Sequence, residues 1–202
     1  LDRPAIRQTF ATACARGHAS VAQWLADRFA FTAIDARADH NYALRFACAN
    51  GHLGVAQWLA DRFALTAADA RADGNYTLSL ACVNGHLGMA QWLTERFALT
   101  TVDARANGNE ALRAACVCGH ADVAHWLTER FSLTAADARA DDNYALRWAC
   151  FNGHLGVAQW LADRFSLTAA DARTYNNETL RGACYNGHLE VARWMTERFA
   201  LT

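Results

Sequence analysis

A block of 34 residues recurs along the whole chain, and no insertion interrupts it. The copies that begin at Asn41 and Asn143 differ at only 6 of 34 positions. A repeat of this length predicts an array in which each unit buries its apolar side against its neighbours. The dipeptide Gly-His marks the copies, at residues 17–18, 51–52, 85–86, 119–120, 153–154 and 187–188.

Each unit is predicted to contain two helices joined by a glycine loop. In the second unit Asn41 is the predicted N-cap of the first helix, and Leu44 and Cys48 lie four residues apart on its apolar stripe. Gly51 then supplies the left-handed residue that ends this helix, because glycine adopts a positive φ without steric cost.

The second helix carries Val55 and Leu59 on its apolar side, with Trp58 beside them. A third, short helix is predicted to begin after Thr66. A threonine followed three residues later by an acid, here Asp69, is typical of a capping box. We expect almost no strand.

One set of equivalent positions predicts packing between units. Trp148 is its largest member, and the equivalents one unit away are Ala114 and Gly182. A large residue between two small ones is expected if these positions meet across units at native packing density.

The segment ALRFACANGHLGVAQWLA, residues 43–60, resembles the core of the ankyrin repeat. Leu44, Ala47, Gly51 and His52 occupy positions that match the ankyrin pattern. The departures recur in every unit: a tryptophan takes a leucine position, and the period is 34 rather than 33 residues. This variant looks like the divergent ankyrin arrays of giant viruses and their amoebal or algal hosts.

The resemblance implies an all-α fold, a solenoid of six ankyrin-like helix-turn-helix repeats. The short third helix predicted from the residues departs from the family pattern and takes the place of the usual β-hairpin finger. We expect one solenoid over residues 1–202. The repeats cover approximately residues 7–40, 41–74, 75–108, 109–142, 143–176 and 177–202.

Glycine, histidine and tryptophan recur in every unit and are interpreted as structural. The histidine begins the second helix and is expected to hydrogen-bond to the backbone of its own or the adjacent repeat. The indole is predicted to lie in the core. The predicted structural residues are Gly51, His52, Trp58, Gly85, His86, Trp92, Gly153, His154 and Trp160.

Six cysteines keep the 34-residue register and are predicted to be buried thiols, which favours a reducing, intracellular location over secretion. Cys116, Cys118, His120 and His125 form the only cluster of cysteine and histidine. The two cysteines are expected on different sides of one helix, so no metal and no cofactor is predicted. Cys118 takes a loop position and is predicted to be exposed and the most readily modified thiol.

The formal net charge is −1, and acidic and basic residues are interspersed. This balance gives no electrostatic reason to expect nucleic acid or a membrane as a partner. The pairs Asp61-Arg62 and Asp69-x-Arg71 are interpreted as a solvated face and a ladder of loop charges, worth about 0–1 kcal/mol per pair. No phosphate loop, nucleophile elbow or carboxylate dyad is present, so the chain is not predicted to be an enzyme.

In an array, recognition must reside in the positions that change. Three positions vary most: the residues before and after Asn41 and its equivalents, and the residue two before each loop glycine. By the resemblance they lie near the concave groove of ankyrin arrays, where aromatic side chains anchor partners. The alternative is drift at tolerant surface positions, with Phe151 packing between repeats. The predicted partner-binding residues are Tyr42, Tyr76, Tyr144, Phe151, Tyr175, Tyr185, His40 and Asp142.

The predicted function is a non-enzymatic scaffold that recognises a protein partner through its variable concave face. The alternative is a structural or self-associating array. The last repeat has no polar cap, so end-to-end docking through it would bury its outer face.

Overall fold

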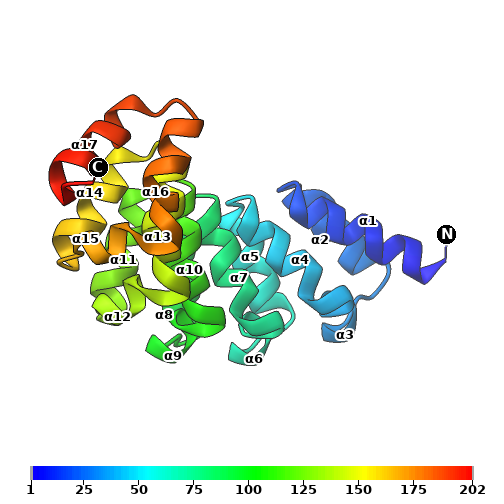
Figure 1. Ribbon diagram of the computed structural model, residues 1–202. Coiled ribbons are helices and arrows are strands. Elements are labelled where there is room, and N and C mark those ends of the chain that lie inside the picture. Colours follow the sequence, from blue (N-terminus) through cyan, green and yellow to red (C-terminus); the bar gives the residue numbers. More distant parts are fainter. Residues whose placement is uncertain (1, 202) are drawn as a thin grey trace. The chain divides into compact units, whose positions relative to one another are not determined.

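The computed structural model describes residues 2–201, and every regular element in that range is a helix (Figure 1). The all-α repeat fold predicted from the sequence is confirmed. The first helices of the repeats are α1 (Arg3–Ala15), α4 (Ala38–Ala49), α7 (Ala72–Val83), α10 (Ala106–Val117), α13 (Ala140–Phe151) and α16 (Thr174–Tyr185). The second helices are α2 (Ala19–Arg28), α5 (Leu53–Arg62), α8 (Leu87–Arg96), α11 (Ala121–Phe131), α14 (Leu155–Arg164) and α17 (Leu189–Phe199).

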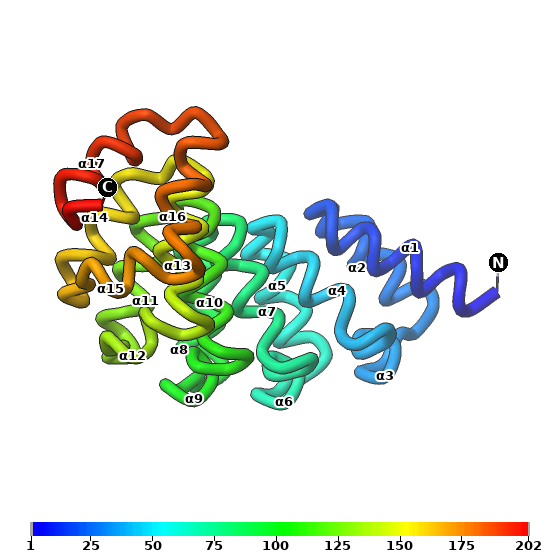
Figure 2. Tube along the Cα trace, viewed as in Figure 1, coloured from blue at the N-terminus to red at the C-terminus, as the bar shows by residue number. Residues whose placement is uncertain are grey.

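The chain divides into two compact units, residues 1–103 and residues 104–202. In the first unit α4 packs against α1 and α7, and in the second unit α13 packs against α10 and α16 (Figure 2). That one solenoid spans both units stays a prediction from the uninterrupted repeat. None of the helices in residues 2–201 has the length and apolarity needed to cross a bilayer.

The core forms along the apolar stripes that the sequence predicts. Leu44 and Cys48 on α4 are fully buried, and so is Leu59 on α5. Burying a side chain of leucine size stabilises the fold by about 1.5–3 kcal/mol. Since α4 contacts α5 and the first helices on either side, the stripes are covered only when repeats stack.

The predicted third helix is present, with the predicted cap. Thr66 precedes α6, and its backbone N–H and its hydroxyl both donate to Oδ2 of Asp69, at 2.7 and 3.1 Å. A capping box of this kind satisfies backbone groups that a helix end leaves unpaired. The short helices are α3 (Ala33–Ala36), α6 (Ala67–Ala70), α9 (Thr101–Ala104), α12 (Ala135–Ala138) and α15 (Ala169–Ala172).

The predicted N-cap at Asn41 is wrong. Asp39, His40 and Asn41 have φ angles of 52°, 56° and 59°, so a left-handed turn directly precedes Tyr42. Asn41 is buried in this turn and its Nδ2 donates to the backbone oxygen of Asp69 at the short third helix of the same repeat, at 3.3 Å. Asn, Asp and Gly tolerate a positive φ best, which explains their frequency in these turns. The turns are residues 39–41, 73–75, 107–109, 141–143 and 175–177.

The prediction that the indoles lie in the core is wrong, because they are only partly buried. Trp58 is half-buried, with its ring centroid 5.7 Å from that of Phe63 and 6.2 Å from that of Phe10 in the preceding repeat. Trp24 is 60% exposed. The indole flanks the buried stripe rather than belonging to it, so it covers the phenylalanine that follows five residues later.

Five of the six in-register cysteines are buried as predicted, and Cys184 is the exception. Cys184 is exposed, because within residues 2–201 no helix packs on the outer side of α16. Cys118, predicted to be exposed, is half-buried. The buried members are Cys14, Cys48, Cys82, Cys116 and Cys150.

Candidate functional site

The Gly-His loops of consecutive repeats pack on one another. A Cβ added to Gly51 would lie 2.8 Å from Cε1 of His86, and one added to Gly153 would lie 2.6 Å from Nδ1 of His188. The imidazoles of His52, His86, His154 and His188 therefore pack directly on the loop glycine of the repeat before them. The φ of Gly51, 72°, also excludes most other residues. Glycine is therefore required at this position both by its backbone conformation and by the imidazole packed against it.

His154 links to the repeat before it as the sequence predicts. Its imidazole hydrogen-bonds to the backbone of Val117. Burial lowers the pKa of His154 below the ordinary histidine value, against the opposing effect of this hydrogen bond. Burial between the two repeats therefore favours the neutral form of the His154 imidazole.

The interpretation of Asp69 and its equivalents is wrong for the solvated face, because Asp69 is buried, and is confirmed for the ladder of loop charges. Asp69 is buried, and it accepts two hydrogen bonds from Arg37 of the preceding repeat, at 2.6 and 2.9 Å. Its near neighbour Arg71 reaches forward to Asp103 instead. Each carboxylate therefore caps a short helix and anchors the previous repeat with the same two oxygens. Asp61 is exposed as predicted.

These contacts hold the carboxyl groups ionised. The hydrogen bonds from Arg71 lower the pKa of Asp103 to about 2, against the opposing effect of burial. For Asp69, burial raises the pKa, but the hydrogen bonds from Arg37 and Thr66 outweigh it and the pKa is lowered. Charge-assisted hydrogen bonds favour the ionised form in this way.

A second set of arginines joins repeats on the first helices. Arg45 pairs with Asp73, and its guanidinium carbon lies 5.5 Å from the ring centroid of Tyr76. The same position in the fourth repeat, Arg113, pairs with Asp141 and lies 4.9 Å from the ring of Tyr144. We call this arrangement the arginine–tyrosine contact.

Sequence reasoning missed this contact. In the fifth repeat Arg147 pairs with Glu178 and lies 4.5 Å from the ring centroid of Tyr175. The available signal was an arginine in one register, followed in the next repeat by an acid and a tyrosine three residues apart. The three tyrosines were predicted to bind a partner, and each already contacts an arginine on the first helix before its own.

The predicted partner-binding residues of the first unit each contact another side chain of that unit. Tyr42 is half-buried and stacked on Phe46, with ring centroids 4.2 Å apart. His40 is exposed, and its Nδ1 lies 3.6 Å from Oδ1 of Asp73. Tyr76 retains 38% exposure beside Arg45.

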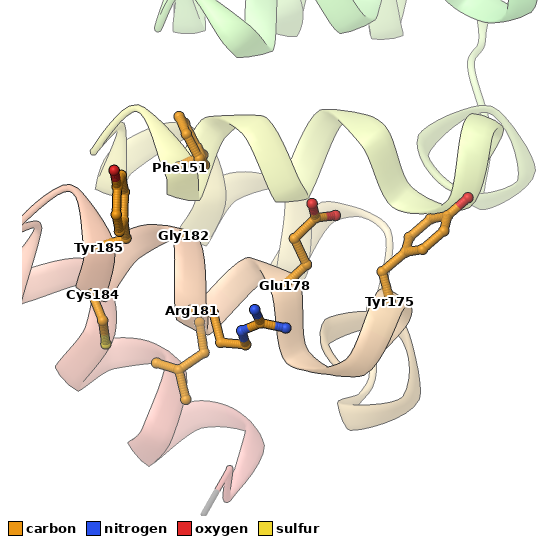
Figure 3. A pocket seen from close by; sticks show the side chains of 8 residues that line it. Phe151, Tyr175, Glu178, Arg181, Gly182, Cys184 and Tyr185 are labelled. Carbon is orange, nitrogen blue, oxygen red and sulfur yellow. The ribbon is translucent and has the colours of Figure 1, made fainter.

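In the second unit, three predicted residues meet at one cavity. Phe151 on α13, with Tyr175 and Tyr185 on α16, lines a hollow of about 900 Å³ (Figure 3). Tyr185 is 88% exposed and Tyr175 is 58% exposed. Asp142, also predicted, accepts a hydrogen bond from the Tyr175 hydroxyl at 2.8 Å.

Gly182 lies in the floor of this cavity, and its small size admits Phe151. A Cβ at Gly182 would lie 2.7 Å from Cδ2 of Phe151. The sequence predicted that Gly182 would make room for Trp148. Trp148 instead packs on Phe151, with ring centroids 4.7 Å apart. Phe151 therefore has a packing role between repeats as well as a place in the cavity wall.

Two family models describe most of the chain. The model for ankyrin repeats in three copies matches residues 63–142, and the model for ankyrin repeats in many copies matches residues 10–60. The chain belongs to the ankyrin repeat family. Ankyrin repeats are in general modules for protein–protein interaction.

A solved structure of an ankyrin repeat family protein from Legionella pneumophila is similar to this ankyrin repeat chain. The TM-score is 0.55 and the sequences are 19% identical, over 98% of this chain and 74% of the other. At this identity the likeness shows the fold alone. No curated protein matches the chain by sequence. The resemblance to giant-virus and amoebal arrays stays a prediction.

The cysteines and histidines of the fourth ankyrin repeat differ in burial. Among residues 2–201 no group of three cysteine, histidine or acidic side chains is arranged to hold an ion. Cys116 is buried, and Cys118 is half-buried at the start of the loop. Burial raises the pKa of both thiols, which disfavours the thiolate that zinc requires.

Proposed function

We propose that this ankyrin repeat chain is a non-enzymatic, intracellular scaffold that binds a protein partner, and that the contact surface is the cavity of α13 and α16. The observation that carries the proposal is the exposure of Tyr185 and Tyr175 beside the half-buried Phe151. Tyrosine supplies a large apolar area together with a hydrogen-bonding group, and it is enriched where proteins bind each other.

The remaining predicted residues support this location over one in the first unit. Tyr42 is stacked on Phe46, and Tyr76 is 38% exposed beside Arg45, whereas Tyr175 keeps 58% exposure although it also contacts an arginine. Tyr185 has no such cover. A surface built on packed helices is ordered before it binds, so association costs little conformational entropy.

The intracellular location rests on the thiols. Five buried cysteines remain free, and free thiols persist in reducing compartments. The net charge of −1 supports a protein partner rather than nucleic acid.

Affinity capture from a cell lysate with the full chain as bait tests the proposal. We expect a captured protein to be lost with Tyr185→Ala, since truncating an aromatic anchor often costs binding about 2 kcal/mol or more. Ile34→Ala is the matched control, because Ile34 is an exposed apolar side chain on α3, at 77% exposure. Equal capture by the wild type and by Tyr185→Ala would show that the proposed surface is wrong.

A further inference from the structure

Arg181 occupies the position of Arg45, Arg113 and Arg147 in the last repeat. Each of those three arginines makes the arginine–tyrosine contact with the repeat that follows it. Arg181 is exposed, and within residues 2–201 it makes no hydrogen bond or ion pair. It lines the cavity described above, between Glu178 and Tyr185 along α16 (Figure 3).

The groups that satisfy the other arginines share one spacing. In the first unit Asp73 and Tyr76 are three residues apart, and both contact Arg45. In the second unit Asp141 and Tyr144 repeat this spacing at Arg113.

The third contact keeps the spacing and reverses the order. Tyr175 precedes Glu178 by three residues, and both contact Arg147. A carboxylate neutralises the guanidinium while an aromatic face stacks on it, and the two interactions use different sides of the same planar group. The chain has therefore used one recognition chemistry at three places.

We propose that Arg181 and the cavity beside it bind a partner segment that carries a carboxylate and a tyrosine three residues apart. This inference rests on the proposed function and specifies the chemistry of the partner. Charge complementarity carries it, because Arg181 presents a cation without a counter-ion beside the apolar surface of Tyr185 and Leu180. The carboxylate pairs with the guanidinium, and the tyrosine ring stacks on its face.

A second copy of this chain is a poor occupant. The residues of α1 that correspond to Asp73 and Tyr76 are Ala5 and Gln8, which offer neither a carboxylate nor a ring. Arg3 and Arg7 lie on the same helix and share the single carboxylate of Asp35, so the pairing leaves an excess positive charge that would face Arg181. A segment of a different protein that has the stated spacing fits better than α1.

The direct test uses a fluorescent peptide with the sequence of residues 72–80, which holds Asp73 and Tyr76 and no cysteine. Its fluorescence anisotropy is measured against the full chain and two variants. Arg181→Gln should weaken binding about tenfold or more, as expected for a charge-assisted pair. Arg164→Gln, which removes an arginine at the end of α14, is the matched control and should bind like the wild type.

Two altered peptides complete the test. Peptides with Asp73→Asn or Tyr76→Leu should each lose affinity for the wild-type chain. The Asp73→Asn peptide, which has no carboxylate to pair with Arg181, should also show little difference between the wild type and Arg181→Gln. The inference is overturned if the parent peptide fails to bind at about 1 mM. It is also overturned if Arg181→Gln binds as well as Arg164→Gln.

The same variant separates this inference from the proposed function. If lysate capture is lost with Tyr185→Ala and retained with Arg181→Gln, the proposed function stands and the arginine chemistry is wrong. If neither variant changes the capture, both are wrong. Sedimentation of the wild type over a concentration series adds one more outcome, since a dimer lost with Arg181→Gln would make the second copy the occupant.

Discussion

The hydroxyl of Tyr175 donates a hydrogen bond to Oδ2 of Asp142, at 2.8 Å, across two consecutive repeats. Both residues were predicted from the sequence to contact a partner, because both positions vary along the array. Their pairing shows that two variable positions of consecutive repeats can contact each other. The pair fixes the tyrosine ring beside Arg147.

This pair gives a spectroscopic prediction. The hydrogen bond and the negative charge of Asp142 raise the pKa of Tyr175, because both disfavour the phenolate. Asp142→Asn should therefore lower the pKa of Tyr175 in an ultraviolet titration, and Asp39→Asn, at the equivalent exposed turn of the second repeat, should leave it unchanged. An unchanged titration of Tyr175 in Asp142→Asn would contradict the hydrogen bond.

Because Gly51 packs on His86 and a Cβ added at Gly54 meets no neighbour, we expect a glycine-to-alanine substitution to have opposite effects at the two positions. Gly51→Ala places a methyl group 2.8 Å from the imidazole at a φ of 72°, and should cost about 1–2 kcal/mol or more in the free energy of unfolding. Gly54→Ala lies on α5, where a Cβ meets no atom within 4 Å, and should stabilise by about 0.5–1 kcal/mol. Urea unfolding of both variants measures the difference, and equal midpoints would contradict the joint.

Asp103 predicts a pH-dependent contribution to stability. Asp103→Asn removes the ion pair with Arg71 and weakens the helix cap, so it should cost about 1–3 kcal/mol at neutral pH. The control Asp61→Asn removes an exposed pair with Arg96 and should cost about 0–1 kcal/mol.

The sign of the pH effect follows from the lowered pKa of Asp103. The folded value, about 2, lies below the ordinary value of about 3.9, so the stabilisation is complete above pH about 4. It is lost as the pH falls through the folded pKa. The difference between the wild type and Asp103→Asn should therefore shrink between about pH 4 and pH 2. A difference that stays constant over this range would exclude the ionised pair as its cause.

The thiols predict a single fast-reacting cysteine. Cys184 is exposed, whereas burial raises the pKa of Cys118 and of the fully buried thiols such as Cys48. A thiolate-specific reagent should label one of the seven cysteines in a fast phase. Cys184→Ser should remove that phase and Cys118→Ser should retain it. The reverse result would restore the sequence-based prediction.

The sequence alone determined the repeat, the two-helix unit and the short third helix. These follow from local rules: an apolar stripe with helical spacing, a glycine that ends a helix, and the capping box of Thr66 and Asp69. The family resemblance rested on the same residues. Each of these features needs only neighbours within about one turn of the chain.

The tertiary structure decided which repeat each side chain serves. Arg71 stands two residues from Asp69 in the sequence and binds Asp103 instead, since the stacking of repeats places residues about 32 positions apart in contact. The same stacking set Phe151 rather than Trp148 over Gly182, and left Cys184 exposed while its equivalents are buried. A repeating sequence presents the same side chains at every step. Only the packing of one repeat on the next decides which side chains are covered. Others, such as Tyr185 and Arg181, remain exposed for binding.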